Sequence, residues 1–370
     1  KTILIAGGNK MSLNPNDISL LKIIVNSAKE ARISLEKKKN TEVNKLLKQI
    51  THKVLNNKVN YHLCSLAVKE THFGNIKDKV QKNINKTNNL LNDLKDIKIF
   101  EPFLNKENNI YEIYKPIGVI CGVTPSTNPI ATSLNYVLNS IKARNSIIIC
   151  PNLRSYNTVK ELVEILKSVL EENKISKEIV NIAPKSILRD DTVIELFNLC
   201  DKNIVTGNQL MISRVKKSIK PFLVFGAGNV PIIVDENAKI EYAAQSIVLS
   251  KSFDNSTSCS ADSVLIVNKK IYTNFRNKLK KNNVYFLNKE EKKKLDKIYF
   301  VKGVVNHQLV AKSANEILEK ININTQNINY RIVAYEFDSN IKKHYILNEK
   351  ILPLIGITTF KNFEEALKIA

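Results

Sequence analysis

The sequence predicts an α/β protein in which a mostly helical N-terminal region precedes parallel sheets covered by helices. From about residue 113, short runs of β-branched and apolar residues alternate with amphipathic helical patterns. Strands separated by helices need crossover connections, so these strands should pair in parallel and be buried on both faces. The chain has 370 residues, 43% of them hydrophobic, which suits two domains. We expect these domains to cover residues 1–227 and 228–370.

The N-terminal region, residues 14–100, shows apolar residues at spacings of three and four. Leu20, Leu21 and Ile24 illustrate this spacing, which places them on one face of a helix. Residues 36–60 are so rich in Lys and Asn that little packing surface remains. We therefore expect a long exposed helix in that stretch.

The elements that follow alternate regularly along the chain. In the first domain we expect strands at residues 118–124, 146–150, 180–183, 203–206 and 222–226, and helices at residues 130–144, 157–173, 191–200 and 209–218. In the second domain we expect strands at residues 231–234 and 263–267, and helices at residues 240–250, 271–280 and 362–369. Ligands of such sheets bind at the carboxyl ends of the strands.

The composition excludes several classes of protein. No apolar stretch approaches the roughly 18 residues that a membrane-spanning helix needs, and the short apolar run near the N-terminus does not resemble a secretory signal. Five widely spaced cysteines indicate a reducing compartment, so we expect a cytoplasmic protein. The net charge is +22, but the basic residues are mostly Lys, spread along helices. We favour compositional drift over nucleic-acid binding as its cause, because Arg, the preferred reader of bases, is scarce.

Two loops of the first domain carry polar groups at strand ends. In the loop at residues 124–129 (TPSTNP), two prolines hold the turn, and Asn128 could either cap a helix or aim its amide at an oxyanion. In Thr206-Gly207-Asn208, a glycine between strand and helix would let backbone N–H groups approach a phosphate. The later sequence GAGN at residues 226–229 lacks the third glycine and the helix of a dinucleotide fingerprint.

A third loop, residues 253–260 (FDNSTSCS), contains Cys259 among hydroxyl side chains. Such donors can stabilise a thiolate, which is the nucleophilic form of cysteine, although a small inert cysteine fits the pattern as well. The other four cysteines suit the inert role. No histidine has the spacing of a metal site, and we expect no metal.

Taken in order, these loops resemble the CoA-acylating branch of the aldehyde dehydrogenase superfamily. The resemblance rests on KPIGVICGVTPSTNPIATSLNYVLNSIKARNSIIICPN, on KPFLVFGAGNVPIIVDENAKIEYAAQSIVLSKSFDNSTSCSADSVLIV and on NEKILPLIGITTFKNFEEALKIA, with a weaker match in AVKETHFGNIKDKVQKN. It covers about residues 13–370. It implies a parallel-sheet cofactor domain, a smaller α/β catalytic domain and an active site between them.

The resemblance also implies roles for individual residues. Cys259 matches the nucleophile, and Asn128 matches the side-chain donor of the oxyanion hole. The residues implied to bind NAD or NADP are Thr124, Pro151, Asn152, Thr206, Gly207, Asn208, Gly226, Ala227 and Glu349. Among these, residues 206–208 match the pyrophosphate site and Glu349 a ribose carboxylate.

One departure from hydrolytic members indicates the acyl acceptor. Where those members carry a Glu that activates water, this chain has Phe225, which cannot act as a base. A thiol needs less help than water, so we expect coenzyme A to accept the acyl group. The expected reaction converts an aldehyde, NAD(P)⁺ and CoA to acyl-CoA and NAD(P)H.

Other departures leave a second hypothesis open. The chain ends before the last part of the family's catalytic domain, which also carries an oligomerisation strand. It could therefore be a truncated, non-catalytic relative that binds nucleotide or a full-length partner. With that segment supplied, the resemblance implies a homo-oligomer, with no membrane or nucleic-acid partner.

Overall fold

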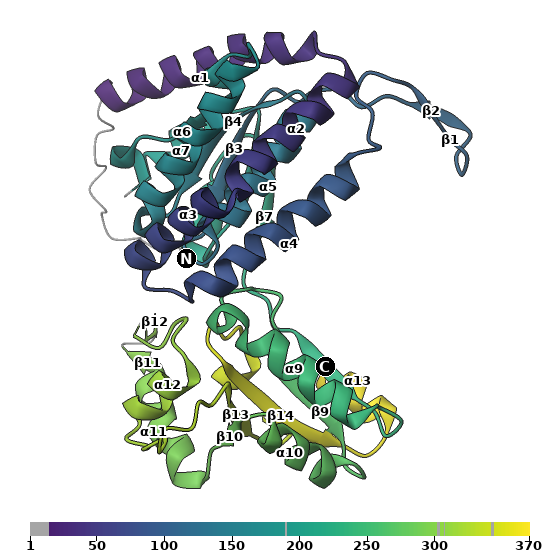
Figure 1. Ribbon diagram of the computed structural model, residues 1–370, viewed down its shortest axis with the longest axis vertical. Coiled ribbons are helices and arrows are strands. Elements are labelled where there is room, and N and C mark those ends of the chain that lie inside the picture. Colours follow the sequence, from purple (N-terminus) through teal and green to yellow (C-terminus); the bar gives the residue numbers. More distant parts are fainter. Residues whose placement is uncertain (1–14, 189–190, 302–303, 307, 342–343) are drawn as a thin grey trace, which may run out of the picture. The chain divides into compact units, whose positions relative to one another are not determined.

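The computed structural model describes residues 15–188, 191–301, 304–306, 308–341 and 344–370 (Figure 1). The first fourteen residues of the predicted N-terminal domain thus lie outside the described residues. The chain divides into two compact units, which are described separately. Unit 1 contains the described residues up to Val54, Thr87–Pro125 and Thr132–Phe225, and unit 2 contains Leu55–Lys86, Ser126–Ala131 and Gly226–Ala370.

The N-terminal region is helical as predicted, with α1 at Pro15–Glu36, α2 at Asn40–Leu55, α3 at Asn57–Thr71 and α4 at Ile76–Leu94. The expected long exposed helix is wrong. Two helices occupy that stretch, because Asn56 starts α3 by accepting a hydrogen bond from the Lys58 N–H. Helix α2 is not exposed all round either. It buries Val43, Leu46, Leu47, Ile50, Thr51 and Val54, so the polar composition concealed a complete apolar face.

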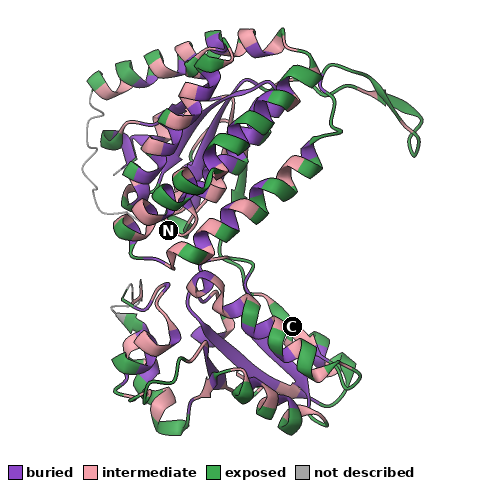
Figure 2. Ribbon diagram, in the orientation of Figure 1, coloured by how far each residue is buried: buried purple, intermediate pink, exposed green. Residues whose placement is uncertain are grey.

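Unit 1 is built on a five-stranded parallel sheet in the order β5-β4-β3-β6-β7. Its strands are β3 (Val119–Thr124), β4 (Ser146–Pro151), β5 (Val180–Ile182), β6 (Lys202–Thr206) and β7 (Phe222–Phe225). Its crossover helices are α5 (Pro129–Lys142), α6 (Tyr156–Glu172), α7 (Val193–Leu199) and α8 (Gln209–Val215). Every residue of β3 and β4 is buried, which explains their uninterrupted apolar sequences (Figure 2).

Helices pack on both faces of the unit 1 sheet. Cys121 and Ile148 join a core with Leu21 of α1 and Phe197 of α7. The opposite face carries α5, where the ring of Tyr136 lies against Gly122. A Cβ at Gly122 would come within 3.0 Å of that ring, so glycine permits the close approach of helix and strand.

Unit 2 contains a second five-stranded parallel sheet, in the order β10-β13-β14-β9-β8. Its strands are β8 (Pro231–Val234), β9 (Val264–Asn268), β10 (Val284–Phe286), β13 (Ile332–Glu336) and β14 (Leu354–Phe360). Its helices are α9 (Ile240–Ser252), α10 (Tyr272–Lys281), α11 (Lys289–Tyr299), α12 (Ala314–Lys320) and α13 (Phe363–Ile369). Each strand predicted in this part of the chain is present, and the α/β class is confirmed.

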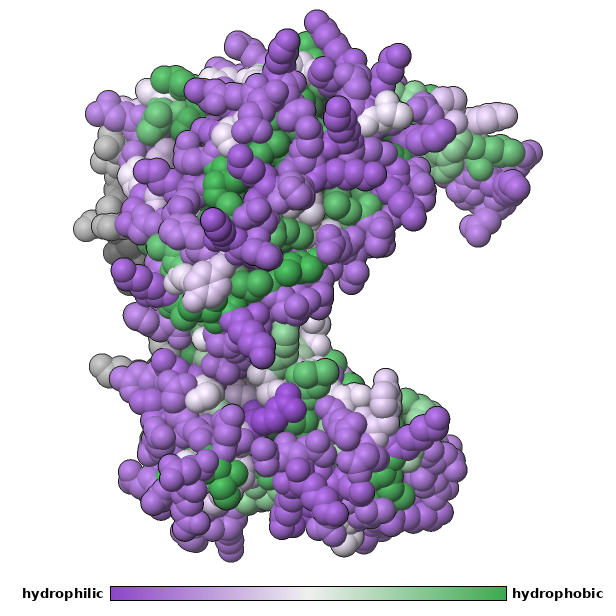
Figure 3. Space-filling model, viewed as in Figure 1, coloured by the Kyte–Doolittle hydropathy of each residue, from purple (hydrophilic) through white to green (hydrophobic). Residues whose placement is uncertain are grey.

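Two small hairpins are additional to the predicted elements. Strand β1 (Phe103–Asn105) pairs antiparallel with β2 (Ile110–Glu112), and β11 (Phe300–Val301) pairs with β12 (Val304–Val305). Within the described ranges, no helix is long and apolar enough to cross a membrane. On the face drawn in Figure 3, hydrophilic residues dominate the surface.

Candidate active site

Cys259 lies on a short loop of unit 2 between α9 and β9. Helix α9 ends at Ser252, a 3₁₀ turn follows at Phe253–Ser256, and Cys259 comes three residues later. Its side chain is exposed, whereas Cys64, Cys121, Cys150 and Cys200 are buried. Burial raises the pKa of Cys64 to about 12, which removes it as a thiolate near neutral pH. Among the five cysteines, the exposed one is therefore the candidate nucleophile.

Asn128 reaches the same loop from a distant part of the sequence. Its segment, Ser126–Ala131, belongs to unit 2 with Cys259. The Asn128 side-chain N–H donates to the Thr257 carbonyl at 3.0 Å, two residues before Cys259. The structure therefore ties the predicted oxyanion donor to the loop that carries the predicted nucleophile.

Gly228, which follows the predicted residues Gly226 and Ala227, lies near both Glu349 and Cys259 in unit 2. Its N–H donates weakly to Glu349 Oε1 at 3.4 Å, and a Cβ built on it would lie 3.9 Å from the Cys259 carbonyl oxygen. Burial raises the pKa of Glu349, while the Gly228 N–H and the charge of Lys251 oppose that rise. The segment that begins with Gly226 and Ala227 thus runs past both Glu349 and Cys259.

The other predicted cofactor residues gather at one edge of the unit 1 sheet. Thr124, Pro151 and Thr206 are the last residues of β3, β4 and β6, which are neighbouring strands. The strand register pairs Thr124 with Pro151, and the Thr206 and Tyr136 hydroxyl oxygens lie 2.5 Å apart. Because parallel strands end at the same edge, these side chains lie where such sheets bind ligands.

In the loops after β4 and β6, an Asn side chain accepts a hydrogen bond from a backbone N–H a few residues later. Asn152 accepts from the Arg154 N–H at 3.0 Å and starts a 3₁₀ turn, while Asn208 accepts from the Met211 N–H at 3.1 Å and starts α8. Gly207 donates to the Phe225 carbonyl at 3.2 Å. A Cβ at Gly207 would come within 3.3 Å of the Met211 side chain, so only glycine keeps this turn uncrowded.

A cluster of buried charges lies behind the Cys259 loop, and the sequence did not reveal it. Lys79 and Lys82 of α4 both form ion pairs with Asp254, at 3.0 and 2.6 Å. Lys82 also donates to Asn128 Oδ1 at 2.8 Å. Burial lowers the pKa of Lys82 to about 8, against the opposing pull of Asp254. The only sequence signal is the three-residue spacing of the lysines, which puts both on one helix face.

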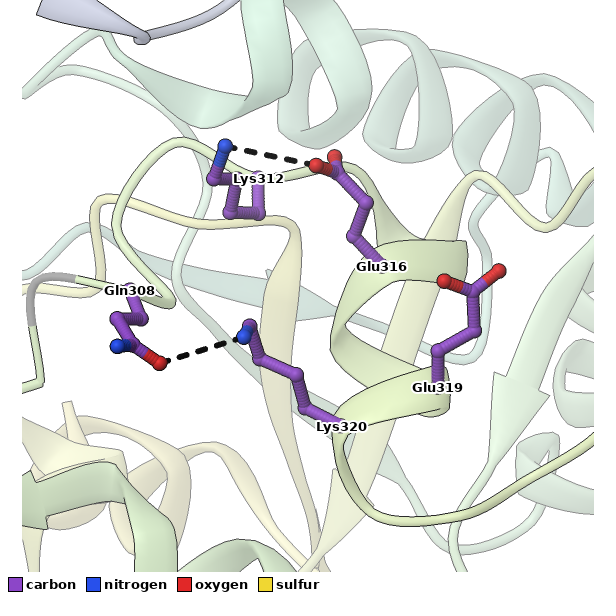
Figure 4. A pocket seen from close by; sticks show the side chains of 5 residues that line it. All are labelled: Gln308, Lys312, Glu316, Glu319 and Lys320. Atoms are coloured by element: carbon purple, nitrogen blue, oxygen red, sulfur yellow. Dashed lines mark hydrogen bonds and ion pairs between the residues drawn. The ribbon is translucent and has the colours of Figure 1, made fainter.

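The described residues offer no candidate metal site, and a surface pocket among them is separate from the predicted site residues. No group of three or more His, Cys, Asp or Glu side chains in the described ranges is arranged to hold a metal ion. A surface pocket of unit 2 is lined by Gln308, Lys312, Glu316, Glu319 and Lys320 (Figure 4). There, Lys312 pairs with Glu316 and Lys320 with Gln308, and none of the predicted site residues lines the pocket.

Comparison with known proteins identifies the family of the chain. The sequence profile of the aldehyde dehydrogenase family matches residues 16–320, which is most of the chain. The chain belongs to the aldehyde dehydrogenase family. Cys259 and Asn128 both lie in unit 2, where the Asn128 side chain donates a hydrogen bond to the loop that carries Cys259.

Among its relatives, this aldehyde dehydrogenase is 32% identical to the aldehyde-alcohol dehydrogenase of Clostridium acetobutylicum, over 83% of this chain and 36% of that protein. It is 30% identical to the sulfoacetaldehyde dehydrogenase (acylating) of Bilophila wadsworthia, over 83% of this chain and 67% of the relative. The crystal structure of an acetylating aldehyde dehydrogenase from Geobacillus thermoglucosidasius superposes with a TM-score of 0.88 and 30% identity, over 96% of this chain and 78% of that one. The chain thus spans only about a third of the aldehyde-alcohol dehydrogenase it matches.

Proposed function

We propose that this chain is an acylating aldehyde dehydrogenase. It converts an aldehyde, NAD(P)⁺ and CoA to acyl-CoA, NAD(P)H and a proton. The observation that carries the proposal is the exposed Cys259 on a loop held by the side-chain amide of Asn128. Relatives whose names describe acylating and acetylating enzymes support the same reaction class.

The first half of the reaction forms a thioester on Cys259. The thiolate sulfur adds to the aldehyde carbon, and the carbonyl oxygen becomes an alkoxide. An N–H of Asn128 and the backbone N–H of Cys259 donate to that alkoxide. When bound, the nicotinamide cofactor supplies the acceptor for the hydride that leaves the former aldehyde carbon. The carbonyl then re-forms, and the acyl group remains bonded to sulfur.

The groups proposed to hold the dinucleotide fit its chemistry. In unit 1, the Thr206 hydroxyl and the Gly207 turn suit phosphate oxygens, with Asn208 next to them, and Thr124 ends the neighbouring strand β3. Pro151 ends strand β4 and Asn152 follows it, and we assign the adenosine ribose to these two residues. In unit 2, the Glu349 carboxylate suits ribose hydroxyls, and we assign Gly226 and Ala227 to the nicotinamide.

The second half transfers the acyl group to CoA. The CoA thiolate attacks the thioester carbon, the bond from that carbon to Cys259 sulfur breaks, and the cysteine thiolate leaves. Phe225 supports this choice of acceptor, because its hydrocarbon ring offers no base to activate water. Hydrolysis to a carboxylate should be slow for the same reason.

The remaining assignments rest on the family resemblance. We propose a boundary between cofactor and catalytic domains at residues 227 and 228, a homo-oligomeric assembly and a cytoplasmic location. Small aldehydes such as acetaldehyde and sulfoacetaldehyde are the substrates to test first, because the relatives' names refer to them or their acyl products.

The test measures NAD(P)H formation from these aldehydes with and without CoA, together with mass spectrometry of the products. We expect turnover to depend on CoA and to yield acyl-CoA. Cys259→Ala should abolish turnover, while Cys200→Ala, which alters a buried thiol of unit 1, should retain it. CoA-independent formation of carboxylate would refute the acylating reaction.

The hypothesis of a non-catalytic relative makes the opposite prediction. Such a protein would bind NAD(P)⁺ without turnover, and its Cys259 would resist alkylation by iodoacetamide. The exposure of Cys259 speaks against this alternative.

A further inference from the structure

The ammonium group of Lys82 has all three of its N–H donors committed around the nucleophile loop. They point to Asp254 Oδ2 at 2.6 Å, Thr257 Oγ1 at 2.7 Å and Asn128 Oδ1 at 2.8 Å. Only 5% of the Lys82 side chain is exposed, so water cannot substitute freely for these contacts. A buried lysine with three acceptors can hold all three groups in fixed positions.

The contact with Asn128 decides which way its amide faces. An ammonium group donates hydrogen bonds and cannot accept them, so the Asn128 atom beside Lys82 must be the oxygen. The amide nitrogen is thereby turned toward the Thr257 carbonyl, 3.0 Å away. That nitrogen has two hydrogens, and its next contact, with Thr127 Oγ1, is at the 3.5 Å limit of a hydrogen bond. The second N–H therefore has only a marginal partner, which a developing alkoxide can replace.

The loop itself is held in a strained conformation by the same carboxylate. Asp254, Asn255 and Ser256 have φ angles of 50°, 50° and 60°, a left-handed run that side chains disfavour. Asp254 accepts from the Asn75 N–H at 2.9 Å and from the Thr257 hydroxyl at 2.5 Å, in addition to its two lysines. These contacts fix the path of the chain that leads to Cys259.

Lys79 provides a matched comparison for Lys82. Both side chains are 5% exposed, both pair with Asp254 Oδ2, and both project from α4. Lys79 differs in its remaining contact, which is the Thr127 backbone carbonyl at 3.2 Å, whereas Lys82 donates to the side chains of Asn128 and Thr257. Loss of either lysine removes one buried ion pair, but only loss of Lys82 frees the amide of Asn128.

We propose that Lys82 is a positioning residue that orients the Asn128 amide toward the acyl oxygen at Cys259. The positive charge of Lys82 also draws electron density from the Asn128 amide through Oδ1, which makes the second N–H of Asn128 a stronger donor. This inference rests on the proposed function, because it assigns Asn128 to the oxyanion.

The experiment compares Lys82→Met, Lys79→Met, Asn128→Ala and the double variant Lys82→Met/Asn128→Ala in the full chain. Loss of one oxyanion donor lowers kcat by about 100- to 1000-fold, and we expect Lys82→Met to approach the loss of Asn128→Ala with little change in KM. The double variant should be no slower than Asn128→Ala, because Lys82 acts through that amide. Lys79→Met should lose about as much thermal stability as Lys82→Met, but its kcat should remain within about tenfold of the wild-type value.

Two results would overturn the inference. One is an equal loss of kcat in Lys82→Met and Lys79→Met. The other is a double variant whose fold-loss of kcat equals the product of the losses in Lys82→Met and Asn128→Ala. If Lys82→Met does not fold, Lys82→Leu takes its place, because it also removes the donor to Asn128 Oδ1.

A crystallographic readout separates this inference from the proposed reaction. If wild-type protein turns over no aldehyde, the proposed function fails, yet the orientation of Asn128 can still be measured. We expect the contact between Asn128 nitrogen and the Thr257 carbonyl to be lost in Lys82→Met and kept in Lys79→Met. Retention of the contact in both variants would refute the role of Lys82.

Discussion

At the residue scale, our proposal makes Phe225 the residue that determines which nucleophile releases the acyl group. It ends β7, and its side chain is 55% exposed, so the position does not serve the core. Its backbone carbonyl accepts from Gly207, a contact that any side chain would leave intact. The side chain can therefore be exchanged to test the choice of acceptor without dismantling the sheet.

Phe225→Glu should restore water as an acceptor. A carboxylate placed there supplies the general base that the wild type lacks, so we expect CoA-independent carboxylate formation to rise by about tenfold or more. Phe225→Gln, which has the same shape without basicity, is the control. Equal hydrolysis in the two variants would show that Phe225 does not determine the acceptor.

The residues of the site were predictable to different degrees. The loops that carry Cys259 and Asn128 could be predicted because each follows a recognisable strand or helix pattern, whereas the roles proposed for the two residues come from the family resemblance. Lys82 could not, because it is one of many lysines in a Lys-rich helix. Its burial depends on Asp254, 172 residues away in sequence, which only the folded chain brings near.

At the element scale, the turn before α4, which contains Gly74, packs closely against Asp254 in the turn after α9. Gly74 has a φ angle of 69°, and a Cβ there would lie 1.9 Å from Asp254 Oδ1 and 3.0 Å from Lys79 Nζ. Neither the backbone angle nor the space accepts a side chain. Glycine at this position therefore allows the Asp254 carboxylate to reach both lysines.

Gly74→Ala should destabilise the protein. Strain of this kind costs about 1–3 kcal/mol per residue, and displacement of Asp254 adds to that cost. The measurement is urea unfolding, with Gly228→Ala as the control, since a Cβ at Gly228 would meet its nearest neighbour at 3.9 Å. Equal midpoints for the two variants would contradict this account of the turn.

The helices and strands were predicted best where burial is complete. Strands β3, β4 and β9 are buried along their whole length, and their apolar runs stand out in the sequence. The hairpin of β1 and β2 was missed because each strand has three residues and none of them is buried. The division between α2 and α3 was missed because one Asn cap ends an otherwise continuous polar pattern.

At the scale of the whole molecule, most lysines of the described residues are not buried, but a few are interior. Lys251 is 1% exposed and donates to the Lys350 carbonyl at 3.1 Å. Burial lowers the pKa of Lys251 to about 7, against the opposing charges of Asp262 and Glu349, and lowers that of Lys350 to about 6. These lysines lose protons in the folded protein at a pH where the unfolded chain keeps them.

The stability of unit 2 should therefore depend on pH in a defined direction. Between the folded pKa of about 7 and the unfolded value of about 10.4, the unfolded chain binds more protons, so stability rises with pH. Lys251→Met removes the part of this dependence that Lys251 contributes, and its Tm relative to wild type should be higher near pH 6 than near pH 9. The exposed Lys294→Met serves as the control. A Tm difference that is the same at both pH values would contradict the lowered pKa of Lys251 in the folded protein.

The central claim is that Cys259 carries the acyl group and passes it to CoA. The most direct test is intact-protein and peptide mass spectrometry after mixing with aldehyde and NAD(P)⁺ in the absence of CoA. We predict an acyl adduct on the peptide containing Cys259, which disappears when CoA is added as acyl-CoA forms. Turnover without any adduct on Cys259, or an adduct that CoA leaves in place, would contradict the account.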